Sequence, residues 1–124
     1  RRIITDPIDS TEPPPRISFT ISRPLRDTAI AVSVKELHHY SCQICGDTID
    51  LPNGKRYAEA HHIRPLGQPH DGPDIMSNIV CLCPNHHVEM DYGVRALRRE
   101  DLKPAVGHEI DDQYLDYHNG YFGF

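Results

Sequence analysis

The sequence predicts one small α+β domain, and three observations lead to that prediction. The chain has 124 residues, which is the length of a single domain. Some segments repeat apolar residues with the helical period, whereas others alternate or run together as β-branched residues, so both helices and strands are expected. Eleven prolines and eight glycines indicate many turns and a modest core. A core of that size usually needs a metal ion or disulfides for stability.

The N-terminal segment, residues 1–26, is predicted to be a proline-rich arm or an interdomain linker. It holds five of the eleven prolines, including the run Pro13-Pro14-Pro15, and it shows no sustained period. The chain begins with an arginine rather than a methionine, so we expect it to be part of a longer protein.

Residues 27–39 predict an amphipathic helix. Asp27 and Thr28 are good N-cap residues. Three apolar side chains then follow at helical spacing: Ile30, Val34 and Leu37. His38 and His39 come at the end of this helix, where an imidazolium interacts favourably with the helix dipole, and we interpret them as capping or surface residues.

The middle of the chain predicts a hairpin turn and two strands. Residues 47–55 contain a Pro-Asn-Gly turn signal, and residues 56–63 form a plausible strand. A proline- and glycine-rich loop is expected at 65–77. Residues 78–82 are apolar and β-branched, which predicts the second strand.

Two more helices are predicted in the last third of the chain. One runs from His86 to about Arg99 and opens near Pro84, although Gly93 inside it weakens the prediction. The other is a short closing helix at residues 110–118. The domain is therefore expected to span residues 27–118, with a C-terminal tail at 119–124.

Charge and hydropathy exclude some classes of protein. The sequence holds 18 acidic and 13 basic residues, a net charge of −5, which does not favour tight binding of nucleic acid by the chain alone. No apolar run reaches the length of a membrane span, and no signal peptide is recognisable. We therefore expect a cytoplasmic protein with no membrane partner.

The cysteines predict a structural zinc site. Cys42 and Cys45 stand in a C-x-x-C turn, and Cys83 and His86 form a C-x-x-H pair downstream. Two such pairs supply the four ligands of a tetrahedral Cys3His zinc site, which would tie distant segments together. Gly46 gives the first turn the freedom to close.

Two alternatives for the cysteines stay open. Cys81 is interpreted as a small buried hydrophobic residue, but it could replace His86 as a zinc ligand. A thioredoxin-like redox role for Cys42 and Cys45 would need a βαβ context, and no such pattern flanks them.

Polar residues mark the junctions of the predicted strand, loop, strand and helix. His61 and His62 end the first strand, Asn78 begins the second, and His87 lies at the start of the helix. Adjacent strand residues point to opposite faces. A twist or bulge near Pro65 would therefore be needed to bring both histidines to one site.

These residues resemble a known family. The segments Ala-His-His-Ile-Arg-Pro-Leu at 60–66 and Ser-Asn-Ile-Val-Cys-Leu-Cys-Pro-Asn-His-His at 77–87 resemble the motif of the HNH endonucleases, which have the ββα-metal fold. The C-x-x-C pair is similar to that of the zinc-stapled branch. The amino-acid sequence around the site is most similar to nuclease domains of McrA-like, modification-dependent restriction endonucleases. Those domains often follow an SRA-type domain that recognises modified bases. The resemblance covers roughly residues 27–118.

The resemblance implies a role for each residue at the junctions. It makes His62 the general base for the attacking water, and His61 and His87 ligands of a catalytic divalent ion. Asn78 is implied to orient the loop and to hold His62 through a hydrogen bond. The last ligand position falls on Asp91, and its carboxylate favours Mg²⁺ or Mn²⁺, though other divalent ions stay possible.

The implied function is hydrolysis of phosphodiester bonds in DNA by a divalent-metal-dependent restriction-type nuclease. Modified DNA is the expected substrate, an N-terminal recognition domain is the expected source of affinity, and a homodimer is possible. Arg64 could bind a phosphate or pair with Glu59 or Asp74. The alternative function is a catalytically inactive, zinc-stapled module that binds nucleic acid or protein.

Overall fold

The computed structural model describes residues 27–124, so the predicted arm at 1–26 lies outside the described residues. The helices are α1 (Ala29–Leu37), α2 (Pro84–Asp91) and α3 (Asp112–Phe122). The strands are β1 (Ile49–Asp50), β2 (Arg56–Tyr57), β3 (Glu59–His62) and β4 (Ile79–Leu82). Short 3-10 turns occupy Pro52–Gly54, Met76–Asn78 and Arg99–Asp101. The predicted α+β class is confirmed.

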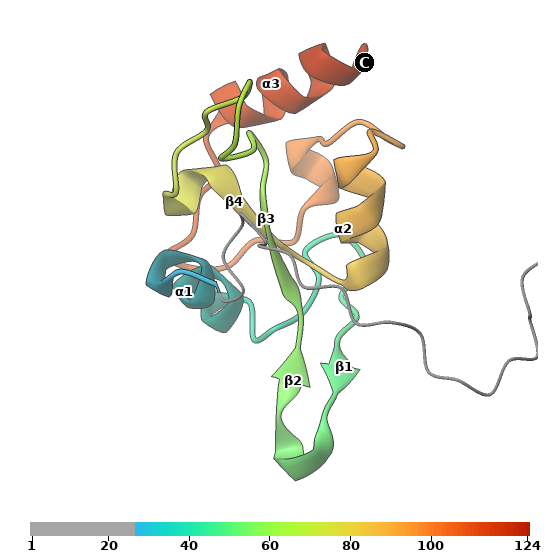
Figure 1. Cartoon of the computed structure of the whole chain (residues 1–124). Coiled ribbons are helices and arrows are strands. Elements are labelled where there is room, and N and C mark those ends of the chain that lie inside the picture. The colour runs from blue at the N-terminus through green and yellow to red at the C-terminus, as the bar shows by residue number, and fades with distance from the viewer. Residues whose placement is uncertain (1–26) are drawn as a thin grey trace, which may run out of the picture.

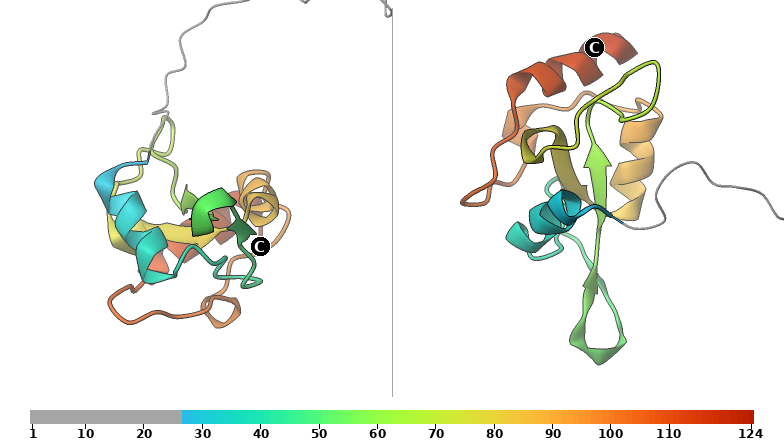
Figure 2. Two further views of the ribbon diagram at one scale, coloured as in Figure 1. Left: turned by 90° about the horizontal axis from the view of Figure 1, so that it is seen from below. Right: turned by 60° about the vertical axis from the view of Figure 1, so that its left-hand side comes forward.

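The antiparallel pair β3–β4 is the centre of the domain, with α1 on one side and α2 on the other (Figure 1). The β4 strand is buried on both faces, which explains its uninterrupted apolar sequence. Ile79 and Cys81 pack with α1, whereas Val80 and Leu82 belong to the cluster that includes Met90 of α2. The other two views show the same layering, with α3 across one end (Figure 2).

Helix α1 begins as predicted, because the Thr28 hydroxyl oxygen accepts a hydrogen bond from the Ala31 amide at 3.2 Å. Its buried face runs through Ala31 and Val34, and Ile30 is exposed. His38 is the C-cap residue of α1, as one of the two interpretations had it, but it is not a surface residue. Its ring is buried, and His38 Nε2 lies 2.7 Å from Nδ1 of His108.

The predicted hairpin is confirmed and projects from the body of the domain (Figure 1). The turn places Asn53 at a φ of 70°, a conformation that asparagine tolerates better than most residues. The predicted strand at 56–63 is split by the buried Ala58 into β2 and β3. Thus β2 belongs to the hairpin, and β3 belongs to the core.

The C-terminal helices differ from the prediction in their ends. Helix α2 stops at Asp91, well before Arg99, because Gly93 has a φ of 65° and lies against the Phe122 ring. Helix α3 starts two residues later than predicted and continues to Phe122, so most of the predicted tail is helical. In residues 27–124, no helix is long and apolar enough to cross a bilayer.

Candidate metal centres and active site

The four predicted zinc ligands come together in one cluster, here called the thiolate cluster, formed by Cys42, Cys45, Cys83 and His86. The C-x-x-C turn and the start of α2 supply two ligands each. No disulfide joins the cysteines of residues 27–124. Two backbone amides, Ile44 and Asp47, lie 3.4 Å from the sulfurs of Cys42 and Cys45, respectively, and donate to them.

The geometry of the thiolate cluster fits a tetrahedral zinc ion. Two sulfurs 2.3 Å from one ion at the tetrahedral angle lie ~3.8 Å apart, and a sulfur–nitrogen pair lies ~3.6 Å apart. The observed separations are 3.8 Å for Cys45–Cys83, 3.6 Å for Cys42–His86 and 3.2 Å for Cys83–His86. Burial and the neighbouring Cys42 raise the pKa of Cys45 to about 12. The hydrogen bond from the Asp47 amide lowers it, but by less. A cation would be needed to hold the Cys45 thiol as a thiolate.

Cys81 lies outside this cluster and is completely buried in the core with α1. Burial raises the pKa of its thiol to about 12, which keeps it in the neutral form that does not bind metal. The interpretation of Cys81 as a core residue therefore fits the structure better than a ligand role.

A second group of ligands gathers where β3 faces α2, and we call it the His–Asp cluster: His61, His87 and Asp91. Nδ1 of His61 lies 3.4 Å from Oδ1 of Asp91, and Nε2 of His87 lies 3.7 Å from Oδ2 of the same carboxylate. His87 and Asp91 are one helical turn apart, so both project from one face of α2.

The chemistry of these donors fits a divalent cation. Burial lowers the pKa of His61, which favours the neutral imidazole that binds metals. Glu59 accepts a hydrogen bond from Nδ1 of His87 at 2.7 Å, which leaves Nε2 with the lone pair toward Asp91. Asp91 is exposed, so the cluster opens to the surface, where a large substrate can reach it.

His62 lies on the opposite face of β3 from His61. The strand is regular here, with His61 opposite Val80 and His62 opposite Ile79, and the chain bends only after it, at Ile63 and Arg64, close to the predicted position at Pro65. Nε2 of His62 lies 2.7 Å from Oδ1 of Asp74. Burial alone would raise the pKa of Asp74, but hydrogen bonds from His62 and Thr28 hold it below its usual value. The charged carboxylate keeps the proton of His62 on Nε2 and leaves Nδ1 as a base.

Asn78 orients the loop as predicted, but its hydrogen bonds do not reach the His62 ring. Its side chain accepts from the Arg64 amide at 2.9 Å and donates to the carbonyls of Arg64 and Pro73 at 3.0 and 2.8 Å. A completely buried amide with these partners closes the loop between β3 and β4. The side chain that contacts the His62 ring is thus Asp74 and not Asn78.

Sequence reasoning missed the two carboxylates that orient the histidines. It offered Glu59 and Asp74 as ion-pair partners of Arg64, and the structure contradicts this because they hold His87 and His62 instead. Glu59 could have been found by strand alternation, since it lies two residues before His61 on the same face. Asp74 comes from an irregular loop, and no periodic signal points to it.

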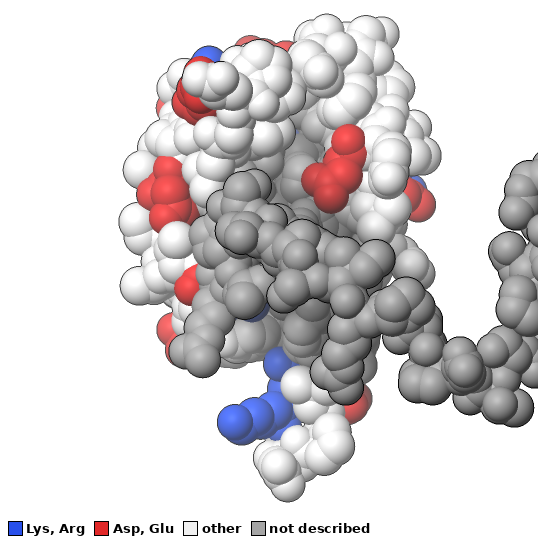
Figure 3. All heavy atoms as spheres, in the orientation of Figure 1, with Lys and Arg blue, Asp and Glu red and all other residues white. Residues whose placement is uncertain are grey.

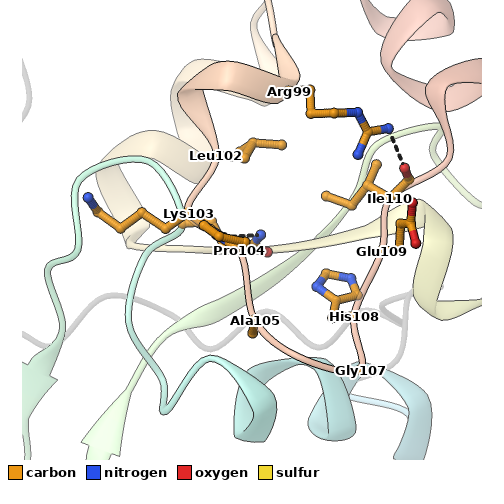
Figure 4. Close-up of a pocket in the computed structure, with 10 residues that line it drawn as sticks. Arg99, Leu102, Lys103, Pro104, Ala105, Gly107, His108, Glu109 and Ile110 are labelled. Carbon is orange, nitrogen blue, oxygen red and sulfur yellow. Dashed lines mark hydrogen bonds between the residues drawn. The ribbon is translucent and has the colours of Figure 1, made fainter.

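A groove of about 720 Å³ lies away from both clusters (Figure 4). Residues 99–110 form most of its wall, and Gln43, which is hydrogen-bonded to Lys103, completes the lining. None of its lining residues belongs to either cluster. The Arg99 guanidinium in it is already engaged, because it donates to the Ile110 carbonyl and pairs with Asp112.

Comparisons with known proteins match this arrangement. Residues 42–97 match the family model of the HNH endonucleases. The chain is 34% identical over 74 residues to the type IV methyl-directed restriction enzyme EcoKMcrA of Escherichia coli (strain K12), which covers 58% of this chain and 26% of that enzyme. The structure of the modification dependent TagI restriction endonuclease matches with a TM-score of 0.71 and 34% identity, over 81% of this chain and 39% of that one.

The chain thus spans well under half the length of either relative. The family match covers both clusters, the β3–β4 pair and all of α2. The resemblance seen in the sequence is confirmed, because residues 42–97 match the HNH endonuclease domain and both relatives are restriction endonucleases.

Proposed function

We propose that this chain is the nuclease module of a restriction enzyme, a divalent-metal-dependent endonuclease that hydrolyses phosphodiester bonds in DNA. One observation carries the proposal: His61 lies in an open His–Asp cluster, and the adjacent His62 is a separate, carboxylate-bound base at the end of the same strand. The family match and the two restriction-enzyme relatives support the same reaction.

The two clusters take different ions in this proposal. The thiolate cluster holds structural Zn²⁺, because three sulfurs and one imidazole are the ligand set that zinc prefers. The His–Asp cluster holds Mg²⁺ or Mn²⁺, because its open position and its carboxylate suit a hard, catalytic ion. An ion bound there would supply Lewis-acid stabilisation of charge on the phosphate and on the leaving oxygen.

The protein's own groups then carry the proton transfer. His61 and His62 lie on opposite faces of β3, but the strand ends at His62, so in this proposal the phosphodiester lies at that end and meets both faces. His62 takes a proton from the attacking water at Nδ1, the nitrogen that Asp74 leaves free. The Asp74 carboxylate stabilises the imidazolium that forms. Glu59 keeps His87 in the tautomer that presents Nε2, and Asn78 holds the loop that carries Asp74. General-base action of this kind contributes roughly 10²–10⁴ in rate.

Nicking of supercoiled plasmid tests this function. The chain should nick DNA with Mg²⁺ or Mn²⁺ and not with a chelator present. His62→Ala should lower the rate by at least about 10²-fold, whereas the exposed His39→Asn should leave it unchanged. Equal rates for the two variants would contradict the base assignment. A chain that binds DNA but does not nick it, whichever divalent ion is added, would instead be the zinc-stapled binding module.

Recognition of modified DNA is proposed to reside in a separate domain of the full-length protein. The chain spans only 26% and 39% of relatives whose names specify methyl-directed or modification-dependent action. Acidic side chains are spread over the face in Figure 3, where the largest basic patch lies at the hairpin, so tight DNA binding by this module is not expected. The chain alone should nick methylated and unmethylated plasmid equally. A clear preference for methylated plasmid would mean that this module itself recognises the modified base.

Cleavage of both strands requires two active sites, so we propose that two copies act together on DNA. The ratio of linear to nicked plasmid should then rise with protein concentration. A ratio that does not depend on concentration would contradict a dimer.

A further inference from the structure

Arg64 occupies a fixed place just beyond the end of β3, two residues after His62. Its backbone amide and carbonyl are both bonded to the Asn78 side chain, at 2.9 and 3.0 Å. Gly72 packs so closely that a Cβ there would lie 1.9 Å from the Arg64 carbonyl oxygen. The backbone that carries this arginine is therefore held from two sides.

The side chain of Arg64 is held as firmly as its backbone. Its Nε donates to the His70 carbonyl oxygen at 2.6 Å, and the guanidinium carbon lies 4.7 Å from the centre of the Tyr117 ring in α3. The Tyr117 hydroxyl lies 2.6 Å from Nδ1 of His70 and locks the two supporting residues together. This cradle fixes the direction of the guanidinium before any ligand binds.

The outer nitrogens of Arg64 have no protein partner among residues 27–124. Both carboxylates considered for it are taken, Glu59 by His87 and Asp74 by His62. Three other cations of the domain are paired with acids, in Lys35–Asp27, Arg95–Glu89 and Arg99–Asp112. The other Lys and Arg residues of 27–124 that no salt bridge pairs are exposed, whereas Arg64 is half-buried and pre-oriented.

We propose that Arg64 binds a phosphate of the DNA backbone next to the bond that is cut. Its two free nitrogens form the planar fork that matches two phosphate oxygens. Arg64 follows His62 by two residues, through a bend just beyond β3, so the two Cα atoms lie at most about 7 Å apart and one DNA strand crossing this end of β3 can meet both residues. The inference rests on the proposed nuclease function, because it assumes that DNA is the ligand of this face.

The salt dependence of DNA binding tests this role. The 124-residue chain carries His62→Ala in every sample to prevent cleavage, and fluorescence anisotropy measures its affinity for a labelled duplex at several salt concentrations. Loss of one phosphate contact lowers the slope of log affinity against log salt by about 0.9. Arg64→Gln should show this change and should weaken binding about tenfold or more at low salt. The control is Lys103→Gln, which removes the same charge from a residue in the groove of Figure 4.

A second measurement does not depend on the folding of a variant. In a ¹⁵N-labelled sample of the His62→Ala chain, the guanidinium signals of Arg64 should shift when duplex DNA is added. Those of Arg99, which is paired with Asp112, should not. This titration decides the matter if Arg64→Gln does not fold.

Each outcome bears on a different claim. A parent-like slope for Arg64→Gln, or an equal change for Lys103→Gln, overturns the inference, as does an unmoved Arg64 signal. If the His62→Ala chain with Arg64 intact binds DNA, and the chain without any substitution nicks plasmid, the proposed function survives such a result. If the parent binds no duplex at all and the unsubstituted chain nicks no plasmid, the proposed function and this inference fall together.

Discussion

Glu59 offers a direct test of how the His–Asp cluster is organised. One of its carboxylate oxygens accepts from Nδ1 of His87 at 2.7 Å, and the other accepts from the Tyr57 hydroxyl at 2.6 Å. Burial alone would raise its pKa, but the hydrogen bonds from Tyr57 and His87 hold it below its usual value. Glu59→Ala would therefore free the His87 ring to rotate and to change tautomer.

The expected loss is a weaker affinity for the divalent ion. Removing an outer partner of a ligating histidine costs 10- to 100-fold in affinity, or about 1.4–2.8 kcal/mol. Glu59 supports only one of the three ligands, and its side chain is 29% exposed, so we expect the lower end, about tenfold. Calorimetric titration of Mn²⁺ into zinc-loaded protein measures the change.

Tyr57→Phe is the matched control, because it removes the other hydrogen bond of Glu59 and leaves the carboxylate on His87. The variant should bind Mn²⁺ within about twofold of the parent, since it keeps the charged hydrogen bond. The reasoning is refuted if Glu59→Ala binds Mn²⁺ as the parent does, or if Tyr57→Phe weakens binding equally.

Three other predictions address the fold, the base and the effect of pH. Cys42→Ser should lose zinc and unfold at a much lower temperature, because the binding energy of a structural zinc is folding energy. Cys81→Ala should keep one zinc per chain in metal analysis. Asp74→Asn should lower the nicking rate about 10²-fold or more with Mn²⁺ affinity unchanged, because an amide can favour the wrong tautomer of the base; an unchanged rate would exclude that role. Burial, with His108 and His39, lowers the pKa of His38 to about 4. The unfolded chain therefore binds more protons than the folded one between about pH 4 and 6.5. The free energy of unfolding should fall by about 2 kcal/mol from pH 7 to 4.5, and less in His38→Gln, as chemical denaturation can measure.

The arrangement of the two clusters could be predicted because it depends on spacing. Paired Cys and His residues in C-x-x-C and C-x-x-H turns can meet at one ion, and an i, i+4 pair on a helix shares one face. Strand alternation also predicted that His61 and His62 point apart, and the regular register of β3 agrees.

Other features depend on contacts between distant segments, and no local pattern indicates them. His38 is buried because His108, seventy residues away, reaches back to its ring. Helix α2 is short because Phe122 of α3 occupies the space beside Gly93. The partner of His62 comes from an irregular loop held by Asn78, so neither period nor propensity could select Asp74 from the other acids.

The central claim is that one small domain holds two different cations at separate places. Anomalous diffraction from a crystal of zinc-loaded protein soaked in Mn²⁺ tests it most directly. We expect a zinc peak inside the thiolate cluster and a manganese peak within bonding distance of His61, His87 and Asp91. A crystal with no manganese at the His–Asp cluster, or with zinc absent from the thiolate cluster, would contradict it.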